Sequence, residues 1–99
     1  MPKISSRSTA VRQHIDARIP FQTYGALMAI SRSENAVGKP LPFTGQLPMR
    51  YVESAERASY VVYSYSTPIA WWSEEDGWTR PEVKYSRTTS VHQGKCPRG

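Results

Sequence analysis

The sequence Tyr60-Val61-Val62-Tyr63-Ser64-Tyr65 decides the fold of this chain, together with Ile69-Ala70-Trp71-Trp72 a few residues later. Both runs are rich in β-branched and aromatic residues, which favour strands. Ser66-Thr67-Pro68 lies between them and has the composition of a tight turn. The sequence therefore predicts a β-hairpin in this region.

A third strand is predicted after the hairpin. Asp76-Gly77 is a favoured pair for a primed turn, in which both central residues need a positive φ, and residues 78–80 then resume the strand pattern. Pro81 lacks a backbone N–H, so we expect this strand at an edge of the sheet. The result is a three-stranded antiparallel meander over about residues 60–85, with residues 69–73 in the middle.

The length of the predicted turn assigns side chains to the two faces of the hairpin. Three residues in the turn place Tyr63 opposite Trp71. One face then holds this pair with Val61, Tyr65 and Ile69. The other face holds Tyr60, Val62, Ala70 and Trp72. Because neighbouring residues of a strand point to opposite faces, the two adjacent tryptophans cannot enter the same core.

Two short helices are predicted in the first part of the chain. Residues 8–18 begin with capping residues and place Val11 and Ile15 at helical spacing, and Pro20 ends the pattern. Residues 49–59 predict a second helix of weak amphipathicity. Together with the meander, these helices indicate a small α+β domain.

The segment between the two helices divides into an apolar part and a connection. Residues 21–30 are mainly apolar around Gly25 and favour a strand. Residues 31–45 are rich in turn-forming types and are long for a connection in a compact domain. They are either a loop pinned over the core by Leu41 and Phe43 or a mobile one.

The chain of 99 residues is long enough for one hydrophobic core, so we expect a single domain over residues 1–99 with disordered tails at 1–7 and 95–99. A core of this size also makes a homodimer plausible. The sequence has no membrane-spanning apolar run and no secretory signal, which favours the cytoplasm. Cys96 is expected to be an exposed thiol without an internal disulfide.

Residue sets for catalysis or metal binding are not evident in the sequence. Ser90 and His92 would point to different faces of a helical turn, so capping explains this region better than catalysis. His14 and Cys96 are too isolated to form a metal site. The acidic residues 74–76 lie at the predicted tip of a hairpin, where solvent and edge protection explain them. We expect a noncatalytic protein without a cofactor or metal ion.

The aromatic sheet is the strongest candidate for binding a partner. Tyrosine and tryptophan anchor protein interfaces and stack on nucleic-acid bases, although a small core needs them as well. The basic residues of the predicted N-terminal helix, together with Arg80, Lys84 and Arg87, keep nucleic acid as an alternative partner. A protein partner, including a second copy of the chain, is the preferred interpretation. The candidate partner-binding residues are Tyr63, Tyr65, Trp71, Trp72, Arg80, Lys84 and Arg87.

Several segments also carry a resemblance to a known family. They are residues 60–71, residues 85–93, Trp78 and Pro81, with residues 45–48 as a further matching segment. Through them the chain resembles a family of short uncharacterised proteins encoded by actinobacteriophages and their actinobacterial hosts. The resemblance brings no catalytic or binding residue with it. It implies a phage accessory protein that acts on a host or phage protein in the host cytoplasm, with toxicity to the host as a further expectation.

Overall fold

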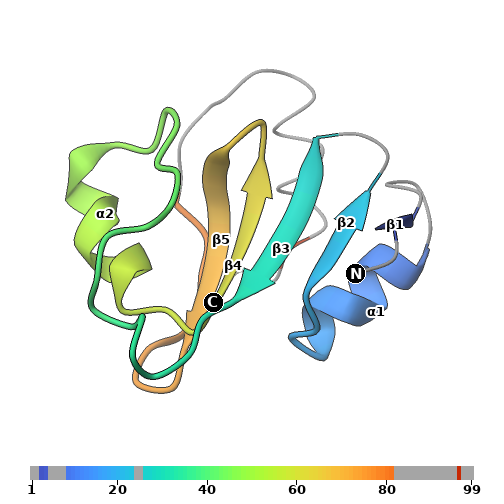
Figure 1. The fold of residues 1–99 in the computed structure, drawn as a ribbon, viewed down its shortest axis with the longest axis horizontal. Helices are drawn as coiled ribbons and strands as arrows, with labels where there is room; N and C mark the ends of the chain where they lie inside the picture. The colour runs from blue at the N-terminus through green and yellow to red at the C-terminus, as the bar shows by residue number, and fades with distance from the viewer. Residues whose placement is uncertain (1–2, 5–8, 24–25, 82–95, 97–99) are drawn as a thin grey trace.

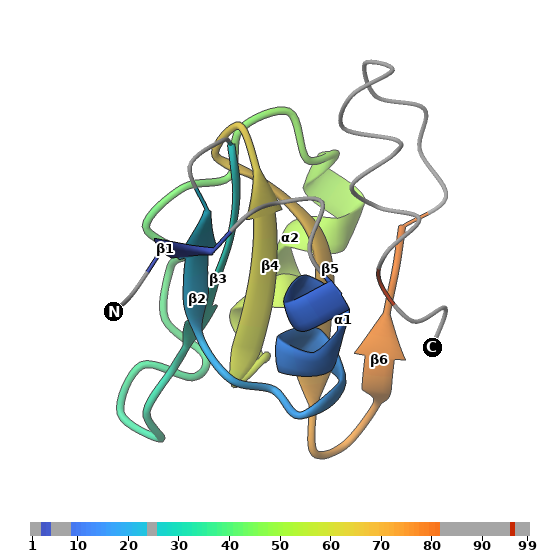
Figure 2. The ribbon, with the colours of Figure 1, turned by 90° about the vertical axis from the view of Figure 1, so that its right-hand side faces the viewer.

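The fold is a mixed sheet flanked by two helices, seen in a computed structural model that describes residues 3–4, 9–23, 26–81 and 96. Six strands lie in sequence order across the sheet, with β1 to β5 labelled in Figure 1 and β6 in Figure 2. β1 runs parallel to β2, and every later neighbouring pair is antiparallel. The predicted α+β class is confirmed, with a wider sheet than expected. The strands are β1 (Lys3–Ile4), β2 (Phe21–Thr23), β3 (Leu27–Ser31), β4 (Tyr60–Ser64), β5 (Thr67–Ser73) and β6 (Gly77–Thr79).

The two helices cover opposite faces of the sheet. Figure 2 shows α1 (Thr9–Asp16) in front of the sheet and α2 (Met49–Glu56) behind it. Both helices were predicted, and both have an apolar side that packs toward the strands. Each face of the sheet therefore has its own hydrophobic core. Neither helix has the length or apolar composition needed to span a bilayer.

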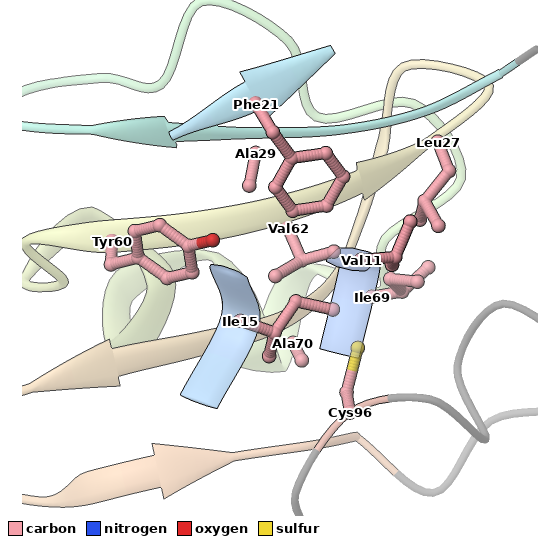
Figure 3. Packing of buried hydrophobic residues seen from close by; sticks show 10 residues of the cluster. All are labelled: Val11, Ile15, Phe21, Leu27, Ala29, Tyr60, Val62, Ile69, Ala70 and Cys96. Carbon is pink, nitrogen blue, oxygen red and sulfur yellow. The ribbon is translucent and has the colours of Figure 1, made fainter. Parts of the chain in front are cut away.

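The first core, which we term the α1 face, is sealed by a helix. Val11 and Ile15 lie one helical turn apart on α1, and neither exposes any surface. Their side chains point into the cluster in Figure 3. Burying each of them fully contributes about 1.5–3 kcal/mol. The cluster comprises Val11, Ile15, Phe21, Leu27, Ala29, Tyr60, Val62, Ile69, Ala70 and Cys96.

Helix α1 ends in a Schellman motif built on an arginine. The amide of Ile19 donates to the carbonyl of His14 at 2.8 Å, and the amide of Arg18 donates to the carbonyl of Ile15 at 3.0 Å. Arg18 has a φ of 56°, a conformation that usually selects glycine. Its guanidinium lies 4.2 Å from the centre of the Trp72 ring. The chain thus places a cation over the tryptophan that faces α1.

The second core, which we term the loop face, is covered by α2 and by the connection that precedes it. Its buried members are Leu41, Leu47, Ala55, Ala58, Val61, Tyr63 and Trp71. The indole N–H of Trp71 donates to the hydroxyl of Ser54 on α2 at 3.0 Å. Of the two alternatives for residues 31–45, the covering loop is the one observed, because Leu41 is buried in this core.

Arg32 holds the first part of this connection in place. Its guanidinium donates to the carbonyl oxygens of Glu56 at 2.8 Å, Ala36 at 2.6 Å and Lys39 at 2.8 Å. The amide of Gly38 also donates to the carbonyl of Glu56, at 2.7 Å. The arginine therefore binds the loop to the C-terminal end of α2 through backbone groups that no sequence pattern indicates.

The register of the β4–β5 hairpin differs from the prediction. Its turn has two residues, because Ser64 pairs with Thr67, and Trp71 lies opposite Val61 instead of Tyr63. This is a shift of two residues in pairing, which leaves most side chains on their predicted faces. Ile69 is the exception. The register slips between Val62 and Tyr63, and Ile69 joins the α1 face.

Two further predictions near the sheet need correction. Among residues 76 and 77, only Gly77 has a positive φ, at 70°, so the primed turn is wrong. The amide of Asp76 instead donates to the hydroxyl of Ser73 at 3.0 Å. Residues 21–30 form two strands, β2 and β3, in place of one. The edge position of β6, with β5 between β4 and β6, is confirmed.

Near the chain ends, two observations differ from the predictions. Cys96 is buried on the α1 face, so the expected exposed thiol is wrong. Burial raises the pKa of this thiol to about 12, against the opposing effect of Arg80. Lys3–Ile4, within the tail expected to be disordered, forms β1. The predicted helical turn at residues 86–94, including Ser90 and His92, lies outside the described residues.

Candidate functional site

The turn between β4 and β5 has an unusual backbone and an exposed aromatic side chain. Tyr65 and Ser66 have φ values of 52° and 65°, as in a two-residue primed turn. Asn-Gly or a similar pair normally fills such a turn, because other residues pay a steric cost for positive φ. Yet Tyr65 leaves 60% of its surface exposed. The turn therefore carries strain without burying the tyrosine that causes it.

The covering loop packs directly against this turn. Gly45 has a φ of 48°, and a Cβ atom added there would lie 2.7 Å from the carbonyl oxygen of Ser66. The amide of Gln46 donates to Oγ1 of Thr67 at 3.0 Å. Glycine is required at position 45 because of both its backbone conformation and this close approach. The loop and the turn thus form one surface at this end of the sheet.

A second exposed aromatic residue belongs to the same surface. Phe43 is 52% exposed, and its ring lies edge-on to that of Tyr63, with centroids 6.2 Å apart and planes at 88°. Tyr63 belongs to β4, two residues before Tyr65. We term this surface the aromatic end, defined by Phe43, Gly45, Tyr65 and Ser66.

Beneath the aromatic end lies a polar atom without a partner. Tyr63 is 1% exposed, and its hydroxyl has no hydrogen bond within the described part of the chain. The backbone of Phe43 lies near enough to act on the pKa of this hydroxyl without forming a hydrogen bond to it. Burial raises the pKa of Tyr63 to about 12, although Arg32 and the Phe43 backbone act to lower it. An unsatisfied buried hydroxyl costs about 1–3 kcal/mol.

The structure separates the aromatic residues that the sequence grouped as partner-binding candidates. Tyr63 and Trp71 are buried on the loop face. Trp72 is partly buried against the α1 face under the guanidinium of Arg18. Tyr65 alone among these four is exposed. The surplus aromatic face that motivated the protein-binding interpretation is therefore covered by the chain itself.

The cationic candidates are not assembled into a described site. Arg80 is partly buried and donates to the carbonyl oxygen of Cys96 at 3.3 Å. Lys84 and Arg87 lie outside the described residues. Within residues 3–4, 9–23, 26–81 and 96, no group of three or more histidine, cysteine or acidic side chains is placed to hold a metal ion.

The opposite end of the sheet has a different character. A cleft of about 290 Å³ lies there, between the end of β3 and the β5–β6 loop. Its arginines are already engaged, since Arg32 binds backbone carbonyls and Arg57 pairs with Glu53 at 3.3 Å and Asp76 at 3.8 Å. The cleft is lined by Arg32, Glu34, Val37, Arg57, Ser59, Ser73, Glu74 and Glu75.

Comparison with known proteins places most of this structure within one family. Residues 21–97 match a family described as Family of unknown function (DUF8033). The chain belongs to DUF8033. The match begins at the first residue of β2 and includes the whole aromatic end, whereas β1 and α1 precede it. No curated protein and no solved structure gave a match.

Sequence reasoning identified only part of the aromatic end. Tyr65 was among the candidate residues, and Phe43 was considered as an apolar pin of the loop. The role of Gly45 was missed because it depends on contact with a turn about 20 residues later in the sequence. The positive φ of Tyr65 was missed because tyrosine carries no turn signal. A glycine followed by a polar residue in a long loop is the only local signal, and it is a weak one.

Proposed function

We propose that this DUF8033 chain is a noncatalytic accessory protein that binds another protein through its aromatic end. The observation that carries the proposal is the strained and exposed Tyr65 beside the exposed Phe43. Strained backbone persists where the surrounding structure enforces it, and such positions cluster at functional sites. Exposed tyrosine is also a preferred anchor of protein interfaces.

The charges near this surface indicate the kind of partner. Residues 40–52 and 58–73 contain no aspartate or glutamate, and their one charged side chain is that of Arg50. Arg50 is exposed at the start of α2, with its guanidinium 5.0 Å from the ring of Tyr51. An apolar protein surface with acidic residues at its rim fits this end of the molecule. The resemblance to phage proteins supports a host or phage protein as the source, and toxicity on expression is a further consequence.

A tagged purification from an actinobacterial host, with and without nuclease, tests this function. Tyr65→Asn is the informative variant, because asparagine tolerates positive φ and the substitution removes the aromatic ring. The wild-type chain should retain a discrete protein after nuclease treatment. Tyr65→Asn should retain about tenfold less of it, with equal or greater folding stability.

Ile19→Asn is the matched control at the other end of the sheet. Ile19 is 47% exposed, and its carbonyl accepts the hydroxyl of Tyr60, the first residue of β4. This variant should retain the partner at the wild-type level. Retention unchanged by Tyr65→Asn would reject the proposal, and so would loss of every partner after nuclease, which is the result that nucleic-acid binding predicts. If the only protein retained is a second copy of this chain, the aromatic end serves self-association and the proposal of a host partner is rejected.

A further inference from the structure

The part of the loop that covers Tyr63 is attached to the sheet by few polar contacts. We term residues 40–45 the strap. Pro40 and Pro42 have no backbone N–H, and no backbone–backbone hydrogen bond between described residues joins the strap to β4 or β5. The strap is held by the buried side chain of Leu41, the edge-on contact of Phe43 and the packing of Gly45. Its cover over Tyr63 is therefore mainly apolar.

The strap is attached firmly at one end and by a single hydrogen bond at the other. Before it, the carbonyl of Lys39 accepts the guanidinium of Arg32 at 2.8 Å. After it, the amide of Gln46 donates to Thr67 at 3.0 Å. The strap can swing away from the sheet by giving up the Gln46 hydrogen bond and its apolar contacts, without breaking the Arg32 contacts. The hydroxyl of Tyr63, which is unpartnered while the strap is closed, would then be free to form a hydrogen bond.

We propose that the strap is displaced when the protein partner binds, and that an oxygen atom of the partner accepts a hydrogen bond from the Tyr63 hydroxyl. This inference rests on the proposed function, because it concerns the same surface. Displacement moves Phe43 away from Tyr63 and leaves an apolar slot beside Tyr65. The unpartnered hydroxyl destabilises the closed strap relative to the open one. The free energy needed to open the strap is therefore small.

Tyr63→Phe tests the inference by removing the hydroxyl and leaving the ring. Hydrogen exchange of the Gln46 amide reports strap opening, because this amide bonds to the side chain of Thr67. In the wild-type chain, Gln46 should exchange faster than the amides of β4. In Tyr63→Phe its exchange should slow by about fivefold to tenfold relative to those amides.

The same variant should bind the partner more weakly without losing stability. The probe is the protein retained by the wild-type chain, and its half-saturating concentration should rise at least fivefold for Tyr63→Phe. Thr67→Val removes the acceptor of the Gln46 amide, which loosens one end of the strap, and should lower the half-saturating concentration of the partner. Tyr51→Phe, on α2, is the matched control and should change neither the exchange of Gln46 nor the binding of the partner.

The outcomes separate this inference from the proposed function. Two results would reject the displacement of the strap. One is exchange of the Gln46 amide in the wild-type chain that is as slow as exchange of the β4 amides. The other is equal binding of the partner by Tyr63→Phe and the wild-type chain. Failure of Tyr65→Asn to reduce retention would instead overturn the protein-binding function. In that case a slower exchange of Gln46 in Tyr63→Phe would still show that the hydroxyl controls the strap, and the partner hydrogen bond would be rejected.

Discussion

The two faces of the sheet each bury one tyrosine of β4, and they treat its hydroxyl differently. On the α1 face, the hydroxyl of Tyr60 donates to the carbonyl of Ile19 at 2.8 Å. On the loop face, the hydroxyl of Tyr63 has no partner in the described chain. Both tyrosines are 1% exposed. The α1 face is therefore a core in which the buried tyrosine hydroxyl is hydrogen-bonded. The loop face is covered by a segment that leaves the buried hydroxyl of Tyr63 without a hydrogen bond.

The largest expected effect concerns the aliphatic side chains that close each face. Ile15→Ala should lower the free energy of unfolding by about 2–5 kcal/mol, because the neighbouring strands cannot fill the cavity. Leu41→Ala, on the strap, should cost less, because the loop can settle into the space. Denaturant unfolding of both variants measures the difference. A greater loss for Leu41→Ala would mean that the loop face is the more rigid core.

Gly45→Ala should have the next largest effect, confined to the aromatic end. The new methyl group would lie 2.1 Å from Oγ1 of Thr67 and would force the strap away from the turn. We expect a loss of about 1–3 kcal/mol, measured by denaturant unfolding. Gly38→Ala is the control, because Gly38 also has a positive φ but nothing within 4 Å of an added Cβ. Equal losses would assign the whole effect to backbone conformation.

Removing each hydroxyl in turn tests the comparison directly. Tyr60→Phe should lower the free energy of unfolding by about 1 kcal/mol, because it leaves the carbonyl of Ile19 without its donor. Tyr63→Phe should leave the free energy unchanged or raise it by up to about 1 kcal/mol, since no bond is lost. Opposite signs in thermal unfolding would confirm the difference between the faces. Equal losses would show that Tyr63 has a partner in solution.

The effect of pH is the smallest near neutrality, because it begins only where the first buried group ionises in the unfolded chain. The pKa of Cys96 rises from 9.0 to about 12, and that of Tyr63 rises from 10.0 to about 12. Both groups keep their protons in the folded chain after they would lose them in the unfolded chain. Their contribution to stability is complete below pH 9 and is lost as the pH rises toward 12.

Thermal unfolding against pH measures this loss. Cys96→Ala should delay its onset from about pH 9 to about pH 10, because tyrosine is then the first buried group to ionise in the unfolded chain. A midpoint that stays constant between pH 8 and pH 10 in the wild-type chain would show that the thiol is accessible to solvent.

The sequence predicted the helices and strands whose formation is determined by neighbouring residues. The spacing of Val11 and Ile15 predicted α1, and the β-branched and aromatic runs predicted β4 and β5. The edge position of β6 followed from Pro81. In each case a few neighbouring residues determine the structure, so their pattern is visible without the rest of the chain.

Features that depend on distant contacts were not predictable in this way. Tyr65 carries no turn signal, and its positive φ fits a turn in which its amide bonds to the carbonyl of Ala26 at 3.3 Å. The role of Arg32 depends on carbonyl groups contributed by α2 and the loop. The aromatic end was therefore only partly predictable, through Tyr65 and Phe43, because its geometry comes from the meeting of the loop and the hairpin.

The slip in register at Ile69 has a consequence for how the length of this chain can vary. Tyr63 pairs with Pro68 and Val62 pairs with Ala70, so Ile69 is an additional residue in β5. Deleting it would join two correctly paired halves of the strand, and no other side chain would change face. The cost would be one missing isoleucine in the α1 face. A single-codon deletion normally moves the inward-facing side chains of a strand to its outer face. Deletion of Ile69 avoids this change, so we expect the shortened chain to fold.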